Sequence, residues 1–352
     1  MCSSIGCGLV VGGDPLADEG DSIADDLAQY QELAATLEAE REQALGDAVT
    51  EVSSAGSWLA WLDRPILGLR RYPDGLELEL PAPGLSYRLG PSRVVTIDRS
   101  GEALIYRGFA LPSGELLDEQ HFDAPAGGGG SPVALLEDAA VIVELDGHVV
   151  WHWRPGVEAP SELGSLADAG VVVERVEQLQ AVDGELGPKL VLRADGRLWI
   201  LELESFTAAS VAELDELLAL DRRGALFTRG DELWLYPFEG EAVRIDAAIA
   251  QSGWSLNPTF PNIHTYAGEG AILADDRVFY ISPAGVFAYA LDQSGPEAIT
   301  PILLEPRWDV AAGIPRIEYR EPRAAGGTVF ARGLIGDHGE LGETGPIFAL
   351  SY

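Results

Sequence analysis

The chain of 352 residues carries 57 acidic against 23 basic side chains, a formal net charge of -34. This charge opposes binding to nucleic acid and to anionic lipid, because both need clustered Lys and Arg, and it favours a basic protein partner or a saline environment. With 47% hydrophobic and 23% charged residues, the composition is that of a folded globular protein, long enough for one large all-β domain or two average ones.

The first 20 residues are rich in Gly, Ser and acidic side chains, and we expect a flexible acidic tail. Both cysteines of the chain, Cys2 and Cys7, lie in this segment, which excludes cysteine-based metal sites elsewhere. As written, the segment lacks the basic start and apolar core of a secretory signal. Two interpretations stay open: a cytoplasmic protein with a disordered tail, or a bacterial cell-envelope lipoprotein anchored by lipid on Cys2. No apolar run elsewhere reaches the ~18 residues of a membrane span.

A helix is predicted from Asp21 to Leu45, and residues 21–57 are expected to form this helix and a linker. Acidic residues occupy its first turn, where the helix dipole favours them, and Gly46 follows its end. Its apolar positions follow spacings of four and three, but the seam includes Ala34 and Arg41. A seam this weak favours packing on the protein's own β domain over a coiled-coil dimer, and the sequence leaves the oligomeric state open.

From residue 58 to 352 the sequence consists of short apolar runs separated by turn residues, which is typical of an all-β domain. Only Ala208 to Leu220 has a further helical period. Asp-Gly and related pairs supply the positive φ angles of tight hairpin turns. These pairs are Asp74-Gly75, Ser100-Gly101, Asp146-Gly147, Asp195-Gly196, Gly230-Asp231 and Asp275-Asp276. The gaps between them are 26, 46, 49, 35 and 45 residues.

Gaps in the forties are typical of the four-stranded blades of a β-propeller. A single blade cannot bury both faces of its sheet, whereas a ring of blades buries each face against a neighbour. At about 42 residues per blade, residues 58–352 provide six or seven blades. The sequence therefore predicts a β-propeller of six or seven four-stranded blades, with a β-sandwich with long loops as the competing fold.

Two segments resemble the repeats of pyrroloquinoline-quinone-type propellers, that is, of quinoprotein-like or WD40-like β-propeller proteins. They are "KLVLRADGRLWILELES" and "GAILADDRVFYISPAGVFAYALDQSGPE", and Leu291 to Gly295 matches the Leu-Asp-x-x-x-Gly ending of that repeat. The likeness is good in these two units, partial in three others and absent from the first 57 residues. It implies a blade and does not imply the quinone, since such repeats also occur in non-enzymatic propellers.

Sequence motifs for catalysis or metal binding are weak. His148 and His152 are four residues apart on an expected strand, about 13 Å along it, which is too far for one metal ion. The acidic run from Asp14 to Asp25 lacks the ligand spacing of a calcium loop. Neither Gly-x-Ser-x-Gly nor Ser-x-x-Lys is present, and Lys189 is the only lysine. "GGGGS" at residues 127–131 is interpreted as a linker between strands. We expect no catalytic residue, metal or cofactor.

Two loops rich in aromatic residues are the candidate binding sites, because binding usually resides in exposed loops on a rigid scaffold and Trp and Tyr are frequent at interfaces. The same side chains could instead fill the gap between two blades. The candidate residues are Trp254, Phe260, His264, Tyr266, Arg307 and Trp308.

The sequence therefore favours a non-catalytic binding or scaffold module that recognises a basic protein partner through loops on the ends of the propeller. The alternative is a propeller enzyme, either a quinone-dependent dehydrogenase or a carbohydrate-active hydrolase or lyase, that uses carboxylates in the central channel. A purely structural surface component is the third hypothesis.

Overall fold

A computed structural model describes residues 31–32, 34–36, 42–45, 51–63, 65–101, 103–123, 133–144, 148–184, 187–251, 270–274, 276–282, 285–293, 298–304, 317–337, 340–341 and 347–351. The tail over residues 1–20, the cysteines and the Gly-rich segment 127–131 lie outside this part of the chain. None of the helices in the described ranges combines the length and the apolar character that a membrane crossing requires.

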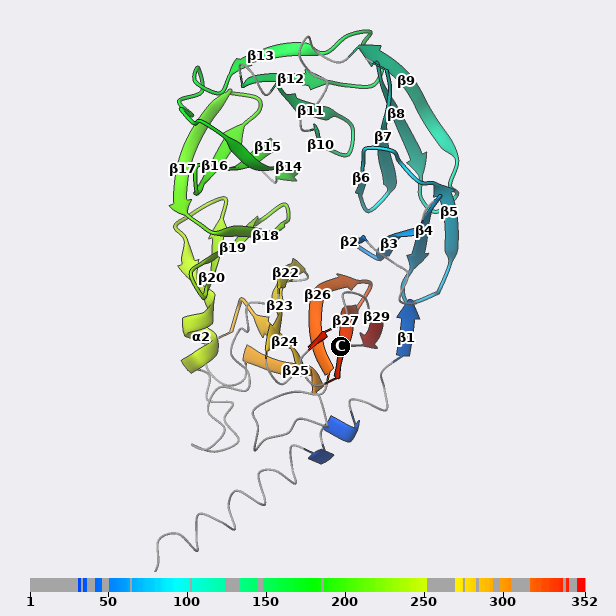
Figure 1. Ribbon diagram of the computed structural model, residues 1–352, viewed down its shortest axis with the longest axis vertical. Coiled ribbons are helices and arrows are strands. Elements are labelled where there is room, and N and C mark those ends of the chain that lie inside the picture. The colour runs from blue at the N-terminus through cyan, green and yellow to red at the C-terminus, as the bar shows by residue number, and fades with distance from the viewer. Residues whose placement is uncertain are drawn as a thin grey trace, which may run out of the picture.

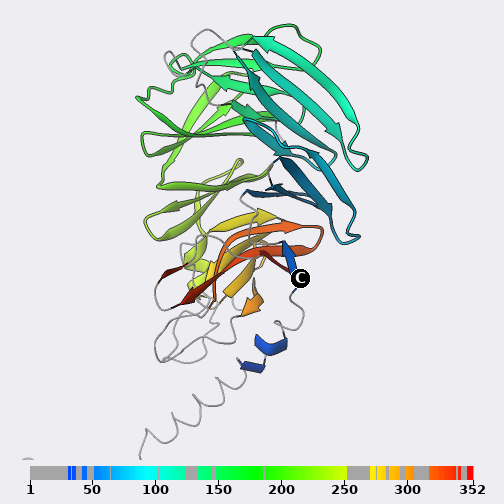
Figure 2. The ribbon, with the colours of Figure 1, turned by 45° about the vertical axis from the view of Figure 1, so that its right-hand side comes forward.

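Seven antiparallel sheets form a ring around a central opening, so the protein is an all-β propeller of seven blades (Figures 1 and 2). Blade 1 consists of β2 (Val52–Ala55), β3 (Trp58–Asp63), β4 (Ile66–Arg71) and β5 (Glu77–Pro81). Blade 2 consists of β6 (Ser86–Leu89), β7 (Arg93–Ser100), β8 (Ala103–Ala110) and β9 (Leu116–Asp123). Blade 3 consists of β10 (Val133–Leu135), β11 (Ala140–Val143), β12 (Val149–Trp153) and β13 (Ser161–Ser165). Blade 4 consists of β14 (Val176–Gly184), β15 (Gly187–Ala194), β16 (Arg197–Glu202) and β17 (Thr207–Glu213). Blade 5 consists of β18 (Glu216–Leu220), β19 (Gly224–Arg229), β20 (Glu232–Pro237) and β21 (Val243–Arg244). Blade 6 consists of β22 (Ala271–Ala274), β23 (Arg277–Ser282), β24 (Gly285–Ala290) and β25 (Ile299–Leu304).

Blade 7 joins the two ends of the chain. Its strands are β26 (Ile317–Ala325), β27 (Thr328–Asp337), β29 (Ile347–Ser351) and, as the outermost strand, β1 (Glu42–Leu45); the short β28 (Glu340–Leu341) pairs with β27. Because β1 pairs antiparallel with β29, backbone hydrogen bonds close the ring between segments from opposite ends of the sequence.

The hydrophobic core consists of seven separate clusters, one between each pair of neighbouring blades. In β15, Leu190 and Leu192 pack against blade 3, whereas Val191 between them packs against blade 5. A middle strand is therefore buried on both faces, which explains its unbroken apolar run. The expectation that each sheet is sealed by its neighbours is confirmed.

The outer strands are protected against edge-to-edge pairing. Register shifts interrupt the pairing of four outer strands, β9, β13, β17 and β25, with their neighbours, and β21 has only two residues. Bulges and short strands are ways in which proteins keep an exposed sheet edge from recruiting other chains.

The turns marked in the sequence lie at three different places in a blade. Gly101, Gly196 and Gly230 join second and third strands, whereas Gly75 lies between a third and a fourth strand and Asp276 between a first and a second. This difference explains gaps as unequal as 26 and 46 residues in a ring of similar blades. Asp146 and Gly147 lie outside the described residues.

The structure differs from the sequence-based expectation near the N-terminus. Residues 31, 32 and 34–36 are helical, but β1 occupies the last four residues of the helix predicted to reach Leu45, and β2 lies in the expected linker. The open edge of β29 supplies backbone partners for Glu42–Leu45, and such pairing outweighs local helix propensity. Ala34 is fully buried in the cluster between blades 5 and 6, so the helix packs on its own domain.

Two further assignments are corrected. The stretch from Ala208 to Leu220, which has a helical period, forms β17 and β18, and a helix that the sequence did not predict, α2 (Ile245–Gln251), follows β21. Ile245 and Ile249 of α2 are buried against blades 5 and 6. Pairing with β16 and β19 therefore decided β17 and β18 against their helical period, since few side chains of β17 are buried.

Antiparallel strands give the ring two distinct faces. We call the face that carries the turns between second and third strands, and the connections between blades, the connection face. The opposite face, with the turns between first and second and between third and fourth strands, is the hairpin face.

Candidate functional site

The six residues that the sequence suggested for binding all lie outside the described residues. Trp254, Phe260, His264 and Tyr266 fall in the connection from α2 to β22, and Arg307 and Trp308 fall in the connection from β25 to β26. Both segments join the last element of one blade to the first strand of the next. The structure neither brings these residues together nor separates them, so the candidate site is built from other side chains.

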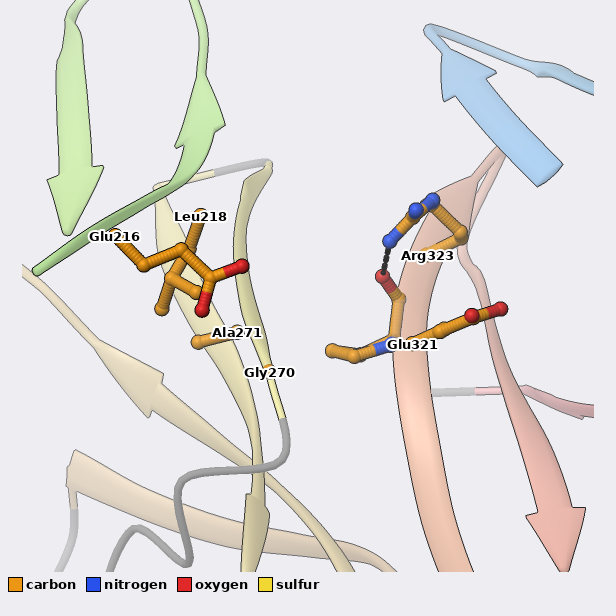
Figure 3. A pocket seen from close by; sticks show the side chains of 7 residues that line it. Glu216, Leu218, Gly270, Ala271, Glu321 and Arg323 are labelled. Carbon is orange, nitrogen blue, oxygen red and sulfur yellow. Dashed lines mark hydrogen bonds between the residues drawn. The ribbon is translucent and has the colours of Figure 1, made fainter. Parts of the chain in front are cut away.

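A cavity of about 260 Å³ opens along the first strands of blades 5, 6 and 7 (Figure 3). First strands are the innermost strands of the blades, so this cavity belongs to the central channel (Figure 1). It is lined by Glu216, Leu218, Gly270, Ala271, Glu321, Pro322 and Arg323.

The two glutamates of this channel cavity do not form a pair. In Figure 3 the carboxylates of Glu216 and Glu321 lie on opposite sides of the opening, and that of Glu321 points away from it. Arg332 contacts the Glu321 carboxylate, with a distance of 3.1 Å between Nε and Oε2. A glycosidase-type mechanism needs two carboxylates that flank one bond, and this cavity does not present them.

Arg323 is held by backbone carbonyls. Its Nε donates to the Val52 carbonyl at 2.8 Å and its Nη1 donates to the Pro322 carbonyl at 2.7 Å. Burial lowers the pKa of Arg323, and the negative charge of Glu321 opposes that shift. The guanidinium therefore ties the inner strand of blade 7 to that of blade 1.

Arg88 plays a similar part on the other side of the channel. Its Nη1 donates to the Leu135 carbonyl at 2.7 Å and also to the Ala181 carbonyl, and its Nη2 lies 3.5 Å from Asp183. Burial lowers the pKa of Arg88, while Asp183 and Glu137 act in the opposite direction. One side chain thereby links the inner strands of blades 2, 3 and 4.

We expect Arg88→Met to destabilise the protein by about 1–2 kcal/mol, because two buried carbonyls lose a charged donor while Asp183 keeps contact with water. Urea unfolding followed by circular dichroism measures this loss. Arg154→Gln, at an exposed arginine on the hairpin face, is the control and should leave the midpoint unchanged. A midpoint for Arg88→Met equal to that of the control would contradict the role of Arg88 as a link.

The histidines do not form a metal site in the described part of the chain. No group of three or more His, Cys, Asp or Glu side chains there is close enough to hold a metal ion. His148 precedes β12 with a φ of 48°, and His152 lies within that strand. The Nε2 atom of His152 is buried without a hydrogen-bond partner in the structure.

We expect His152→Gln to reduce the acid sensitivity of the protein. Burial, aided by the charge of Arg154, lowers the pKa of His152 in the folded state. The unfolded chain then binds a proton more readily, so stability falls as the pH drops below the ordinary histidine pKa of about 6.5. Thermal unfolding at pH about 7.5 and about 5.5 tests this. An equal loss of stability in both proteins would contradict it.

On the connection face, aspartate side chains accept hydrogen bonds from the backbone of the connections between blades. Asp98 accepts the backbone N–H of Gly84, in the connection between blades 1 and 2. Asp195 accepts the N–H groups of Glu174 at 2.8 Å and Arg175 at 3.1 Å, in the connection between blades 3 and 4. In each case a carboxylate of one blade binds the backbone of the connection that leads into that blade, which helps to fix the position of that connection.

A second cavity, of about 370 Å³, lies on the connection face between blades 4 and 5. Asp215, in the connection between these blades, accepts the Gly230 N–H at 2.5 Å. Glu213 lies 3.8 Å from both Arg197 and Arg229. The full lining is Asp195, Gly196, Arg197, Glu213, Leu214, Asp215 and Arg229.

Sequence reasoning assigned no binding or channel role to any of these residues. Asp195 drew attention only as part of a turn, because the N–H groups that it holds belong to residues 20 and 21 positions earlier. Arg88 gave no signal, since its partners lie 47 and 93 residues away. Only the ring brings these groups together.

No protein-family model matches this chain, and no curated protein is similar enough in sequence to count as a relative. Among solved structures, the chain is similar to the Cps50 (Swd1) β-propeller domain of Myceliophteria thermophila, at 13% identity and a TM-score of 0.47, covering 87% of this chain and 99% of that one. It is also similar to tricorn protease, at 12% identity and a TM-score of 0.47, and to PorZ of Porphyromonas gingivalis, at 10% identity and a TM-score of 0.38.

These two matches cover 87% and 88% of this chain but only 34% of tricorn protease and 44% of PorZ. Similarity at these identities and TM-scores carries no argument about function. The pyrroloquinoline-quinone-type repeat also stays a prediction: Leu291 and Asp292, which begin its expected ending, lie between the third and fourth strands of blade 6.

Proposed function

We propose that this protein is a non-catalytic β-propeller scaffold that binds a basic protein partner through its connection face. The observation that carries the proposal is the arrangement of the channel. Two half-buried arginines in it, Arg88 and Arg323, are bound to backbone carbonyls, and the glutamates of its cavity lie apart. The cavity at blades 5, 6 and 7 thus presents no carboxylate pair among the described residues.

The charge of the chain supports a basic partner. A formal net charge of -34 attracts cationic surfaces over several ångströms and repels anionic ones. Electrostatic complementarity of this kind speeds association and excludes partners of the wrong sign. A rigid ring adds to the advantage, because little conformational freedom is lost on binding.

The predicted binding loops belong to the same proposal. The segments with Trp254, Phe260, His264 and Tyr266, and with Arg307 and Trp308, connect consecutive blades, as does the fastened connection that contains Glu174. In this proposal their aromatic side chains would add apolar contacts to those made by charge. A lipid anchor at Cys2 is compatible with this function and remains a proposal of its own.

Selection from a library of random short peptides tests the proposed function. The full chain is immobilised and binders are selected at about 50 mM salt. We expect a consensus with several Lys or Arg and at least one large apolar residue, bound with one-to-one stoichiometry. At about 500 mM salt the affinity should fall about tenfold or more, because screening shortens the range of the attraction. An acidic or uncharged consensus, or no enrichment, would contradict the proposal.

The stoichiometry separates specific from diffuse binding. A surface with this much negative charge also attracts basic peptides without any site, but such binding takes up several peptides per chain. Calorimetric titration of the selected peptide distinguishes the two cases. A stoichiometry well above one, without saturation, would mean that the peptides bind the acidic surface by charge alone and at no defined site. The scaffold function would then be contradicted.

A further inference from the structure

The connection between blades 3 and 4 is an exposed loop with fixed geometry. This loop, Leu166–Arg175, is anchored by hydrophobic side chains at its first residue and in its middle, because Leu166 and Val171 are buried in the cluster between these blades. Its backbone is also bound directly to blade 4: the Ala169 carbonyl accepts the Ala208 N–H at 3.2 Å. Together with Asp195, these contacts hold the loop without any partner.

Val172 is the most exposed large apolar side chain among the described residues. It is 82% exposed, while its neighbour Val171 is 1% exposed. A flexible loop could turn such a side chain inward, but the fixed backbone here presents it to the solvent. Val172 lies two residues before Glu174, whose N–H is held by Asp195 of the second cavity, so one carboxylate links the loop that carries Val172 to the cavity.

The charges of the second cavity are not equally available. Asp195 and Asp215 accept backbone N–H groups and are committed to the loops that they hold. Glu213 is 66% exposed, and its two arginine contacts of 3.8 Å exceed hydrogen-bonding range. Glu213 is therefore the carboxylate that an incoming cation can bind.

The three carboxylates of the cavity lining outnumber its two guanidinium groups. A cationic side chain would gain direct contact with Glu213 and would compete there with Arg197 and Arg229. An anionic ligand would have to displace Glu213 from these arginines and would meet the negative field of the whole chain.

We propose that Val172 and the second cavity together form the docking site for the basic partner, which places an apolar side chain on Val172 and a Lys or Arg side chain against Glu213. This inference rests on the proposed function and locates it on one part of the connection face.

The test uses the full chain and three synthetic peptides: one of alternating leucine and arginine, one with serine in place of leucine, and one with glutamate in place of arginine. Fluorescence anisotropy measures their binding. For the leucine–arginine peptide, Glu213→Gln should weaken binding about three- to tenfold. Arg229→Gln and Arg197→Gln should instead tighten it about two- to threefold, because they remove competitors for Glu213.

Val172→Ser separates the apolar contact from the charge. It should weaken binding of the leucine–arginine peptide about threefold and leave the serine–arginine peptide unchanged. Three matched substitutions on the hairpin face are the controls, at side chains that are exposed on the third-to-fourth strand loop of blade 3. Glu158→Gln, Arg154→Gln and Val157→Ser should each leave the affinity unchanged. Thermal unfolding of every variant confirms that it is folded.

Changes in affinity opposite to those expected would contradict the inference. If the glutamate peptide binds and Arg229→Gln weakens it, the cavity takes an anion. If Glu213→Gln and Glu158→Gln weaken the basic peptide equally, binding is diffuse and no site exists. If the basic peptide binds one-to-one and no variant of either face matters, the docking site is wrong but the scaffold function stands. If no basic peptide binds with saturation, both proposals fall.

Discussion

Removal of the chain through Leu45 is expected to destabilise the propeller by more than about 3 kcal/mol. The deletion takes away β1, so β29 loses the backbone partners of its outer edge. It also removes Leu45, 7% exposed, from the cluster that joins blade 7 to blade 1. Thermal unfolding should show a lower midpoint, and the exposed edge should raise the tendency to aggregate.

A chain that begins at residue 31 is the control, since it keeps β1. The point variant Leu45→Ala, which keeps the strand but removes part of its apolar contact, should lie between the two, at a loss of about 2–3 kcal/mol. Equal midpoints for the chains that begin at residues 31 and 46 would mean that β1 contributes nothing to closing the ring.

Glu202→Gln is expected to destabilise the protein by about 3 kcal/mol, whereas Lys189→Met should change its stability by less than about 1 kcal/mol. Lys189, the only lysine, is 2% exposed, and its Nζ lies 2.6 Å from both carboxylate oxygens of Glu202. The ammonium also lies 5.5 Å from the centre of the Phe238 ring. Removal of Glu202 leaves a buried cation without its counter-charge, whereas removal of the cation leaves a carboxylate that is 40% exposed.

Urea unfolding of the two variants and of the double variant checks this asymmetry. The double variant should be close to Lys189→Met, because the cost of Glu202→Gln arises only while the ammonium is present. A Glu202→Gln variant as stable as the unaltered protein would show that water, and not the carboxylate, stabilises the ammonium.

The blade architecture could be predicted from the sequence because it depends on patterns among neighbouring residues. A strand such as Leu190–Val191–Leu192 is apolar without interruption since it faces two neighbouring blades. Tight turns such as Asp195-Gly196 need positive φ, and both residues have it, at 49° and 69°. The number of blades could be narrowed only to six or seven, because similar turns occur at different places within a blade.

The candidate site could not be predicted from the sequence in the same way. Aromatic loops drew attention to Trp254 and Trp308, whereas the cavity between blades 4 and 5 is made of Asp, Glu and Arg residues that occur throughout this chain. What distinguishes Glu213 is that both of its arginine contacts are as long as 3.8 Å, and what distinguishes Val172 is a loop backbone that Asp195 holds in place. Neither property exists before the ring has formed.

The sequence by itself determined the sign of the surface charge, the predominance of strands and the repetition of a sheet unit, because composition and hydrophobic period act on neighbouring residues. Only the tertiary structure decided that Glu42–Leu45 is a strand and that Arg323 binds the carbonyl of Val52, 271 residues away. Backbone edges and carbonyls far along the chain become partners only when the ring closes. Pairing that satisfies buried polar groups then outweighs the local preferences that a sequence shows.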